Sequence, residues 1–175
     1  MTTALIAMGS NLGDRYANLS WALRGLQAIP RTTLTWQSAL YETAPVGGPE
    51  NQGPFLNAVV SVETALTAAV FLGALHGIEA ALGRERVVRW SARTLDLDLL
   101  TFGETISDDP ALLLPHPRMH ERRFVMVPVC DLVPQMRHPR LGLSMAELLA
   151  RLPVEPGDLA MVRAAWGEPA IELSA

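Results

Sequence analysis

A short alternating run near the middle of the chain constrains its fold more than any other feature. Residues 95–99 read Leu-Asp-Leu-Asp-Leu. As a β-strand, this run places Asp96 and Asp98 on one face and three leucines on the other. The leucines should be buried, whereas two carboxylates about 7 Å apart on one face repel each other unless a cation lies between them. The run therefore predicts a strand buried on one side, with a cation site on the other.

Arginines are concentrated on both sides of this carboxylate pair. Oxygen ligands favour Mg²⁺ over zinc, and guanidinium groups bind phosphate oxygens. The combination predicts a Mg-nucleotide site, and a phosphoryl or pyrophosphoryl transferase fits it best, because such enzymes mainly position groups and neutralise charge. All 14 basic residues are arginines, so no lysine can act as a base or nucleophile. The arginines nearest the pair are Arg84, Arg86, Arg89 and Arg93 before it, and Arg118, Arg122 and Arg123 after it.

The order of apolar patterns predicts a ferredoxin-like α+β fold. Short apolar or alternating runs predict strands, and apolar stripes at helical spacing predict helices. This βαββαβ order predicts an antiparallel sheet with both helices on one face, in a single domain of 175 residues with extra C-terminal elements. The elements are a strand at 4–8, a helix ending at Pro30, strands at 32–41 and 55–64, a helix at 65–82 and the strand at 95–99.

The segments outside this core carry weaker patterns. Residues 43–54 form a connection of about a dozen residues, which is long for a compact domain and often functional. Residues 136–175 suggest no role. Further expected elements are a hairpin region at 102–109, short strands at 112–114 and 124–129, and a helix at 145–152.

Composition excludes several classes of protein. Hydrophobic residues make up 49% of the chain and charged residues 18%, which predicts a folded domain. The net charge of −4 argues against a nucleic-acid binder. The single cysteine, Cys130, rules out an internal disulfide and is expected to be a buried thiol. The chain has no signal peptide pattern and no apolar run near the ~20 residues of a membrane span, so we expect a cytoplasmic protein with no membrane segment.

Two polar residues have alternative interpretations. Glu79 lies in the last turn of a predicted helix, where the helix dipole disfavours negative charge. The arginines after Gly83 could neutralise it, and a plain surface position is the alternative. Asn11 lies in a glycine-rich turn, where it could cap the following helix, as Asp14 could, or belong to a binding site.

The histidines do not form an obvious metal site. Prolines on both sides of His116 exclude a regular helix there, so His116 and His120 are not an i, i+4 metal pair. We expect His76 and His138 to make local hydrogen bonds.

Six motifs together carry a family resemblance. The chain resembles the 6-hydroxymethyl-7,8-dihydropterin pyrophosphokinases of the folate pathway over about residues 4–135. The resemblance implies a ferredoxin-like fold and transfer of a pyrophosphoryl group from ATP to the hydroxymethyl group of the pterin, leaving AMP. The matching motifs are GSNLGDR, YETAPVG, FLNAVV, IEAALGRERVVRW, RTLDLDLL and LPHPRMHERRFVMVP.

The resemblance implies an ATP site around the carboxylate pair. Asp96 and Asp98 would bind two Mg²⁺ ions that bridge the ATP phosphates. The family's other nucleotide contacts match arginines and neighbouring polar residues. Arg84 and Arg93 would stabilise the transferring phosphates, Arg86 and Arg89 would assist, His116 and Arg122 would form a second ATP clamp, and Glu79 and Trp90 would contact nucleotide or close the site.

The resemblance also implies a pterin pocket. Phe55 and Phe124 would stack on the two faces of the pterin, and Asn57 would hydrogen-bond its amide edge. Phe55 and Asn57 share one strand face at i, i+2, which suits that division of roles. Backbone groups near Thr43, Ala44 and Val46 would complete the pocket, with Asn11 close by.

Four positions depart from the family pattern. Trp90-Ser91-Ala92-Arg93 stands where the family usually has Trp-Gly-Pro-Arg, which changes the stiffness of that loop. His76 replaces a glutamine of some members, and Phe55 replaces a tyrosine, which retains the stacking face.

The expected mechanism is direct in-line transfer to the pterin, with no covalent enzyme intermediate. The general base is open between Asp96 and a metal-bound water. We expect a monomer that binds ATP and the pterin. The alternatives are a non-catalytic ferredoxin-like module that binds nucleotide or pterin, and a different Mg-dependent nucleotidyl or phosphoryl transferase.

Overall fold

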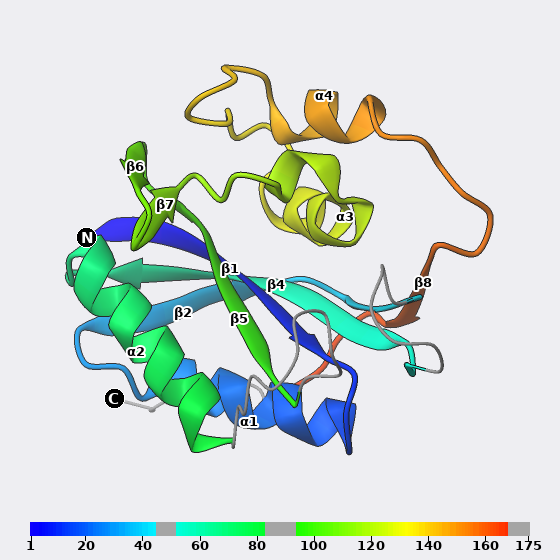
Figure 1. The fold of residues 1–175 in the computed structure, drawn as a ribbon, viewed down its shortest axis with the longest axis horizontal. Helices are drawn as coiled ribbons and strands as arrows, with labels where there is room; N and C mark the ends of the chain where they lie inside the picture. Colours follow the sequence, from blue (N-terminus) through cyan, green and yellow to red (C-terminus); the bar gives the residue numbers. More distant parts are fainter. Residues whose placement is uncertain (45–51, 83–93, 168–175) are drawn as a thin grey trace, which may run out of the picture.

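The computed structural model describes residues 1–44, 52–82 and 94–167. Two layers of helices enclose one antiparallel sheet (Figure 1). The elements are β1 (Thr2–Ser10), α1 (Arg15–Gln27), β2 (Thr32–Gln37), β3 (Leu40–Thr43), β4 (Phe55–Thr64), α2 (Ala68–Ala81), β5 (Asp96–Phe102), β6 (Ser107–Asp109), β7 (Leu112–Leu114), the 3₁₀ turn η1 (Met119–Glu121), α3 (Arg123–Leu132), α4 (Met145–Ala150) and β8 (Leu159–Arg163).

The main sheet has the strand order β5-β1-β4-β3-β8, and β2 also pairs with β4. All of these pairings are antiparallel. The order places β1 and β4 at the centre, as the ferredoxin-like prediction requires, and that prediction is confirmed. The C-terminal strand β8 extends the sheet beyond β3.

The strand expected at 32–41 is divided into β2 and β3. Ser38 lies at the division, and its Oγ accepts a hydrogen bond from the Val59 N–H at 2.9 Å. The same hydroxyl donates to the Ala39 carbonyl oxygen at 2.8 Å. The Ser38 hydroxyl therefore accepts the Val59 N–H that a backbone carbonyl would accept in a regular sheet, and the strand is interrupted there.

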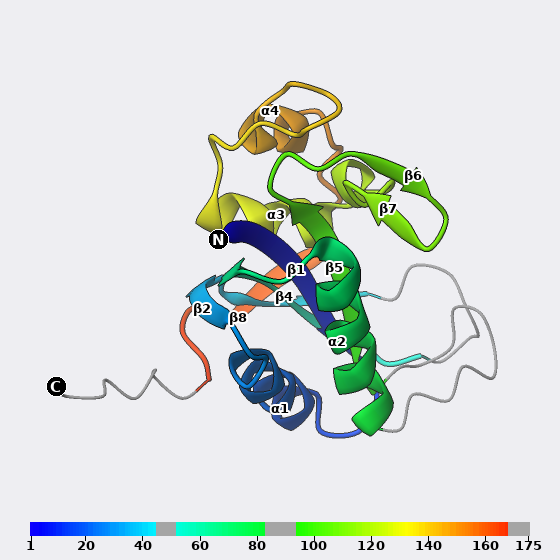
Figure 2. The same ribbon diagram turned by 90° about the vertical axis from the view of Figure 1, so that its left-hand side faces the viewer.

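The first face of the sheet packs against α1 and α2, which both lie on that side (Figure 2). The alternating set Leu56, Ala58, Val60 and Val62 on β4 is buried at 5%, 1%, 0% and 0% exposure, as predicted. Leu95, Leu97 and Leu99 enter the same core. Asp14, rather than Asn11, caps α1, because its Oδ1 accepts the Ala17 N–H at 2.9 Å.

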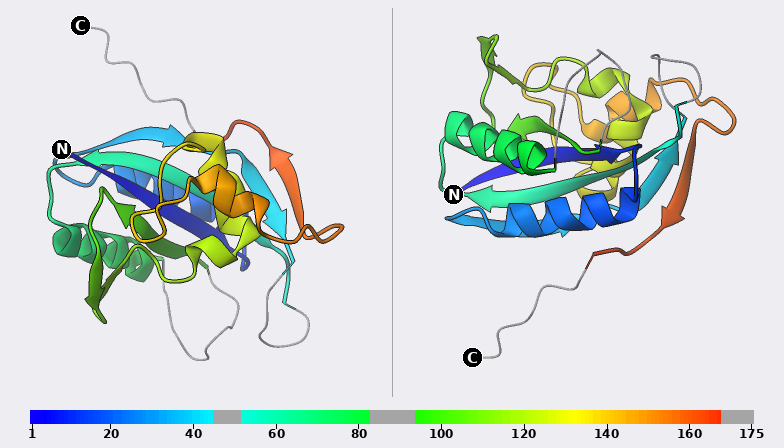
Figure 3. Two further views of the ribbon diagram at one scale, coloured as in Figure 1. Left: turned by 90° about the horizontal axis from the view of Figure 1, so that it is seen from above. Right: turned by 60° about the horizontal axis from the view of Figure 1, so that its bottom comes forward.

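The opposite face is partly covered by α3 and α4 (Figure 3). Residues 124–129, expected to form a strand, lie in helix α3, so that prediction was wrong. Val125, Met126 and Val129 are buried there at helical spacing and cover the sheet. The six-residue run was too short for its period to distinguish the two structures, and packing overrode the strand propensity of valine. The helix at 145–152 was predicted correctly, as α4.

The segment from β5 to α3 brings a loop back across the sheet. The short strand at 112–114 is confirmed as β7, which pairs with β6 in a hairpin. A cis Leu114–Pro115 peptide bond follows it. His116 then donates its backbone N–H to the Leu100 carbonyl oxygen at 2.8 Å, which ties the loop to β5. In the described part of the chain, no helix is long and apolar enough to cross a membrane.

Candidate active site

The carboxylate pair lies on the face of the sheet that α3 and α4 cover only in part. Asp96 pairs with Gly9 of β1, and Gly9 in turn pairs with Asn57 of β4. Directly opposite residues of an antiparallel sheet point to the same face. Asp96, Asp98 and Asn57 are therefore on one face, opposite the buried leucines. The alternation predicted from the sequence is confirmed.

This face divides into an apolar half and a polar half. Leu5, Val59 and Leu100 lie in one half, beneath α3 and α4. Toward the start of β5 and β4, the same face carries Asp96 and Asn57 instead. The polar half forms the floor of the candidate site.

His116 lies within electrostatic reach of Asp96, and Arg122 lies within reach of both aspartates. Burial lowers the pKa of His116, Arg122 and Arg118 lower it further, and Asp96 opposes them. Burial also lowers the pKa of Arg122, while Asp98 and Asp96 act in the opposite direction. The structure thus brings together two carboxylates, an imidazole and a guanidinium group that are separated by up to 26 residues in the sequence.

The hydrogen bonds of His116 define its protonation. Its Nδ1 accepts the backbone N–H of Arg118 at 3.2 Å, so Nδ1 carries the lone pair. With its pKa lowered, the imidazole is neutral near pH 7 and holds its proton on Nε2. His116 therefore offers a hydrogen-bond donor, and Arg122 offers a cation, beside the carboxylate pair.

A second group of predicted residues is gathered at the start of β4. Asn57 is 7% exposed, and its Nδ2 donates to Thr43 Oγ1 at 2.7 Å. Gly9 leaves open the space beside them, since a Cβ at that position would come 3.1 Å from Asn57 Oδ1 and 3.7 Å from Phe55 Cδ1. Thr43 orients the amide, and the missing side chain at Gly9 avoids a close contact with its oxygen.

Phe124 lies in the first turn of α3 and is half-buried. The Arg122 guanidinium carbon lies 5.8 Å from the centroid of its ring. This places Phe124 next to one member of the proposed ATP clamp. Ala44 is exposed after the end of β3.

Glu79 is buried, at 2% exposure, so the alternative of a plain surface position is wrong. Its Oε1 accepts the Leu97 backbone N–H at 2.8 Å. Leu97 stands between the two aspartates, so Glu79 fixes the start of β5 from the end of α2. Its expected cationic partners belong to residues 83–93, which lie outside the described residues.

Arg15 was not predicted as a site residue, although it is part of the GSNLGDR motif. Arg15 Nη1 donates to the Pro54 carbonyl oxygen at 2.8 Å, and Nη2 donates to Glu42 Oε2 at 2.8 Å. Asn11 Nδ2 donates to Gln52 Oε1 at 3.2 Å in the same region. This turn holds both ends of the connection between β3 and β4. Only the position of an arginine directly after the turn could have indicated this role.

The donor set suits a hard divalent cation. Among the described residues, no group of three or more histidine, cysteine, aspartate or glutamate residues could hold a metal ion. Two carboxylates on one strand face fit Mg²⁺, because Mg²⁺ commonly binds to one or two carboxylates and takes its other ligands from water and substrate phosphates. The remaining predicted site residues lie outside the described part of the chain: Val46, Arg84, Arg86, Arg89, Trp90 and Arg93.

A ferredoxin-like sheet that carries a carboxylate pair beside cationic and imidazole groups has the features of a metal-dependent phosphoryl-transfer protein. The model of the 7,8-dihydro-6-hydroxymethylpterin-pyrophosphokinase (HPPK) family matches residues 5–134. The chain belongs to this family.

Curated relatives agree with the family match. The chain is 43% identical over 150 residues to the 2-amino-4-hydroxy-6-hydroxymethyldihydropteridine pyrophosphokinase of Pseudomonas aeruginosa, covering 86% of this chain and 91% of the relative. It is 44% identical over 133 residues to the enzyme of the same name from Bacillus subtilis, covering 76% and 79%.

Solved structures agree at the level of the fold. The crystal structure of wild-type Plasmodium falciparum HPPK-DHPS superposes with a TM-score of 0.65 at 16% identity, covering 86% of this chain and 44% of that one. A triple mutant of the same protein with SDX-DHP gives a TM-score of 0.67, also at 16% identity, covering 86% of this chain and 44% of that one. This chain therefore spans less than half of each of these longer proteins.

Proposed function

We propose that this protein transfers a pyrophosphoryl group from ATP to 6-hydroxymethyl-7,8-dihydropterin, giving AMP and the pterin diphosphate in folate biosynthesis. One observation carries the assignment of the site. Asp96 and Asn57 flank Gly9 on the polar half of one sheet face. The same surface therefore offers a cation site on one side of β1 and an amide suited to a pterin on the other.

The nucleotide side of the site is built from four described residues. Asp96 and Asp98 would hold two Mg²⁺ ions, which when bound with ATP neutralise charge on the phosphates. The Nε2–H of neutral His116 donates to a phosphate oxygen, and Arg122 supplies a positive charge. We place Glu79 behind this surface as the residue that fixes β5. Arg84 and Arg93, assisted by Arg86, Arg89 and Trp90, complete the proposal from outside the described residues.

The acceptor side uses Asn57 and two aromatic rings. Thr43 occupies one Nδ2 hydrogen of Asn57, so Oδ1 remains available to accept an N–H from the pterin. Phe55 and Phe124 provide the stacking faces for a flat bicyclic ring. The backbone near Thr43, Ala44 and Val46, together with Asn11, forms the rim.

Transfer then requires position and charge neutralisation more than covalent chemistry. The hydroxymethyl oxygen attacks the β-phosphorus of ATP in line, and AMP leaves. The acceptor proton passes to Asp96 or to water. We further propose that the protein works as a monomer, which sedimentation equilibrium of the purified chain would test.

The test of the function is a coupled measurement of AMP release. AMP should form only when ATP, Mg²⁺ and 6-hydroxymethyl-7,8-dihydropterin are all present. ADP as the product, or release without the pterin, would favour another nucleotidyl or phosphoryl transferase. Binding of both ligands without turnover would favour a binding module.

The test of the metal ligands uses isosteric variants. Asp96→Asn and Asp98→Asn should each reduce turnover at least 100-fold and retain the fold by circular dichroism, because each removes a carboxylate charge worth several kcal/mol at a metal-assisted transition state. Glu104→Gln, on an exposed turn, is the matched control and should retain activity. Near-normal turnover of either aspartate variant would show that the metal assignment is wrong.

A further inference from the structure

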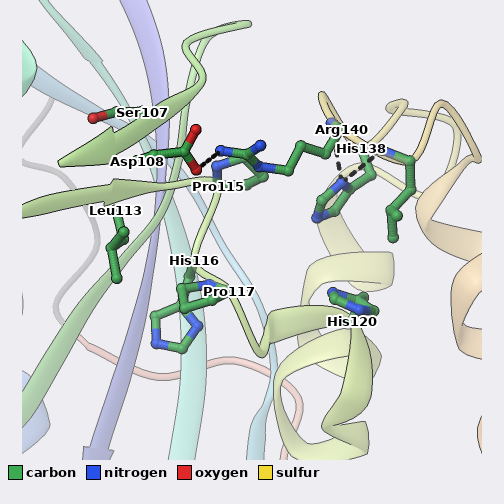
Figure 4. Close-up of a pocket in the computed structure, with 10 residues that line it drawn as sticks. Ser107, Asp108, Leu113, Pro115, His116, Pro117, His120, His138 and Arg140 are labelled. Carbon is green, nitrogen blue, oxygen red and sulfur yellow. Dashed lines mark hydrogen bonds and ion pairs between the residues drawn. The ribbon is translucent and has the colours of Figure 1, made fainter. Parts of the chain in front are cut away.

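A pocket lies beside the candidate active site, between the β6–β7 hairpin and the loop that precedes α4. Its volume is about 170 Å³. His116, His120, His138, Arg140 and Asp108 are among its lining residues (Figure 4). His116 belongs to both the active site and this pocket, whereas the other four have no part in the proposed transfer.

His138 presents a buried hydrogen-bond donor. The residue is 2% exposed. Its Nδ1 accepts the backbone N–H groups of Arg140 at 3.3 Å and Leu141 at 3.2 Å. Nδ1 therefore carries the lone pair, and the proton of the neutral ring is on Nε2. Nε2 is buried and has no hydrogen-bond partner among the described residues.

His120 presents a second buried ring nitrogen. Its Nδ1 also has no partner within the described part of the chain. The rings of His120 and His138 meet edge to face, with centroids 5.5 Å apart. Two buried nitrogens without hydrogen bonds are costly to maintain, so a ligand with oxygen atoms would stabilise this arrangement.

The two backbone hydrogen bonds to His138 Nδ1 exclude coordination of a metal ion by this residue. A metal at Nε2 would need the lone pair there, which would move the proton to Nδ1 and break both bonds to the backbone. The required ligand is an acceptor of hydrogen bonds.

Arg140 indicates that this acceptor is an anion. Its Nη2 binds the Asp108 carboxylate at 2.6 Å across the pocket. The Asp108 side chain is 85% exposed, so it can leave at little cost. The guanidinium group of Arg140 already binds one carboxylate. An oxyanion could replace this carboxylate and also accept a hydrogen bond from His138 Nε2.

We propose that this pocket binds a small oxyanion of the phosphate class. The Nε2–H of His138 and the guanidinium group of Arg140 donate to its oxygens. His120 Nδ1 pairs with another oxygen, as donor to a bare oxygen or as acceptor from a protonated one. The anion is either free phosphate or the phosphate group of a nucleotide.

The full chain is titrated with inorganic phosphate, and binding is measured by isothermal calorimetry and by NMR of the histidine ring nitrogens. The signals of His138 and His120 should shift saturably. His138→Asn should weaken binding at least tenfold, because Asn keeps an acceptor for the backbone N–H groups and loses the Nε2–H donor. Asp108→Asn should tighten binding several-fold, because it removes the competing carboxylate. Circular dichroism checks that each variant is folded.

Titration with AMP in the Asp96→Asn variant distinguishes the two sources of the anion. Shifts with AMP and phosphate alike identify a nucleotide phosphate, whereas shifts with phosphate alone identify the free anion. Absence of saturable shifts, or equal affinity of His138→Asn and the wild type, would overturn the proposal. Shifts seen only with nucleotide and lost in Asp96→Asn would also overturn it, because they would belong to the active site.

Discussion

Gly9 should be the most selective position for separating pterin binding from ATP binding. It lies between Asp96 and Asn57 on the face that carries both halves of the site. A Cβ at this position would stand 3.1 Å from Asn57 Oδ1, a few tenths of an ångström closer than an ordinary contact. Asn57 cannot move freely, because its Nδ2 is bound to Thr43 Oγ1 at 2.7 Å. Gly9→Ala should therefore displace the oxygen that accepts from the pterin.

The expected cost is one weakened hydrogen bond. A hydrogen bond contributes about 0.5–1.5 kcal/mol, so pterin affinity should fall about two- to thirteenfold. Stability should change little, since alanine is favoured over glycine in a strand by about 0.5–1 kcal/mol and the close contact offsets that gain. The affinity for MgATP should remain within twofold, because the new methyl group contacts Asn57 and Phe55.

Calorimetric titration of each substrate separately measures both effects. Gly73→Ala is the matched control, because a Cβ there meets nothing within 4 Å. It should leave both affinities unchanged and should stabilise α2 slightly. Unchanged pterin affinity in a folded Gly9→Ala variant would refute the placement of the pterin beside Asn57. An equal loss for ATP would show that the two halves are not separable at Gly9.

Three further predictions concern residues around the site. Arg15→Leu should raise the KM for pterin several-fold more than the KM for ATP, because it removes the contacts to Glu42 and Pro54. Arg24→Leu, at an exposed position on the same helix, is the control and should alter neither KM. Equal effects of the two variants would contradict the role of Arg15. Burial and then Asp131 raise the pKa of the Cys130 thiol, so at pH 8 it should react with a disulfide reagent far more slowly than in urea, and similar rates would refute this. Burial lowers the pKa of His138 in the folded protein below the unfolded-chain pKa of about 6.5, so folding stability is unaffected by this group above pH 6.5 and decreases as pH falls below it. The free energy of unfolding from urea titrations should therefore decrease from pH 7 to pH 5, and less steeply in His138→Asn. An identical slope in the variant would contradict this prediction.

The βαββαβ core could be predicted because its apolar patterns are long and agree with one another. β4 was placed at Phe55–Thr64 with its buried face, and the buried leucines of β5 followed from strict alternation. α3 was not predicted, because a short run of valine and phenylalanine has no unique period. Its helical state depends on covering Leu5, Val59 and Leu100, which belong to three different strands.

The candidate site was predictable where residue type alone restricts the chemistry. Asp96 and Asp98 can be read from one strand, and their shared face is confirmed. Arg15 could not be found in this way, because its contacts are to Glu42 and to the backbone of Pro54, which depend on the fold. Likewise, the burial of Glu79 follows from the position of β5 next to α2.

The division of one sheet face explains why the active site lies where it does. α3 and α4 bury Leu5, Val59 and Leu100, so this half of the face is closed to solvent. The other half of the face carries Asp96 and Asn57, on either side of Gly9. Hydrogen bonds hold these polar groups in place. Glu79 of α2 accepts the Leu97 N–H between the two aspartates, and Thr43 of β3 accepts a hydrogen bond from Asn57. The core thus holds the carboxylates and the amide in place before either substrate arrives, which is the condition for catalysis by position and charge.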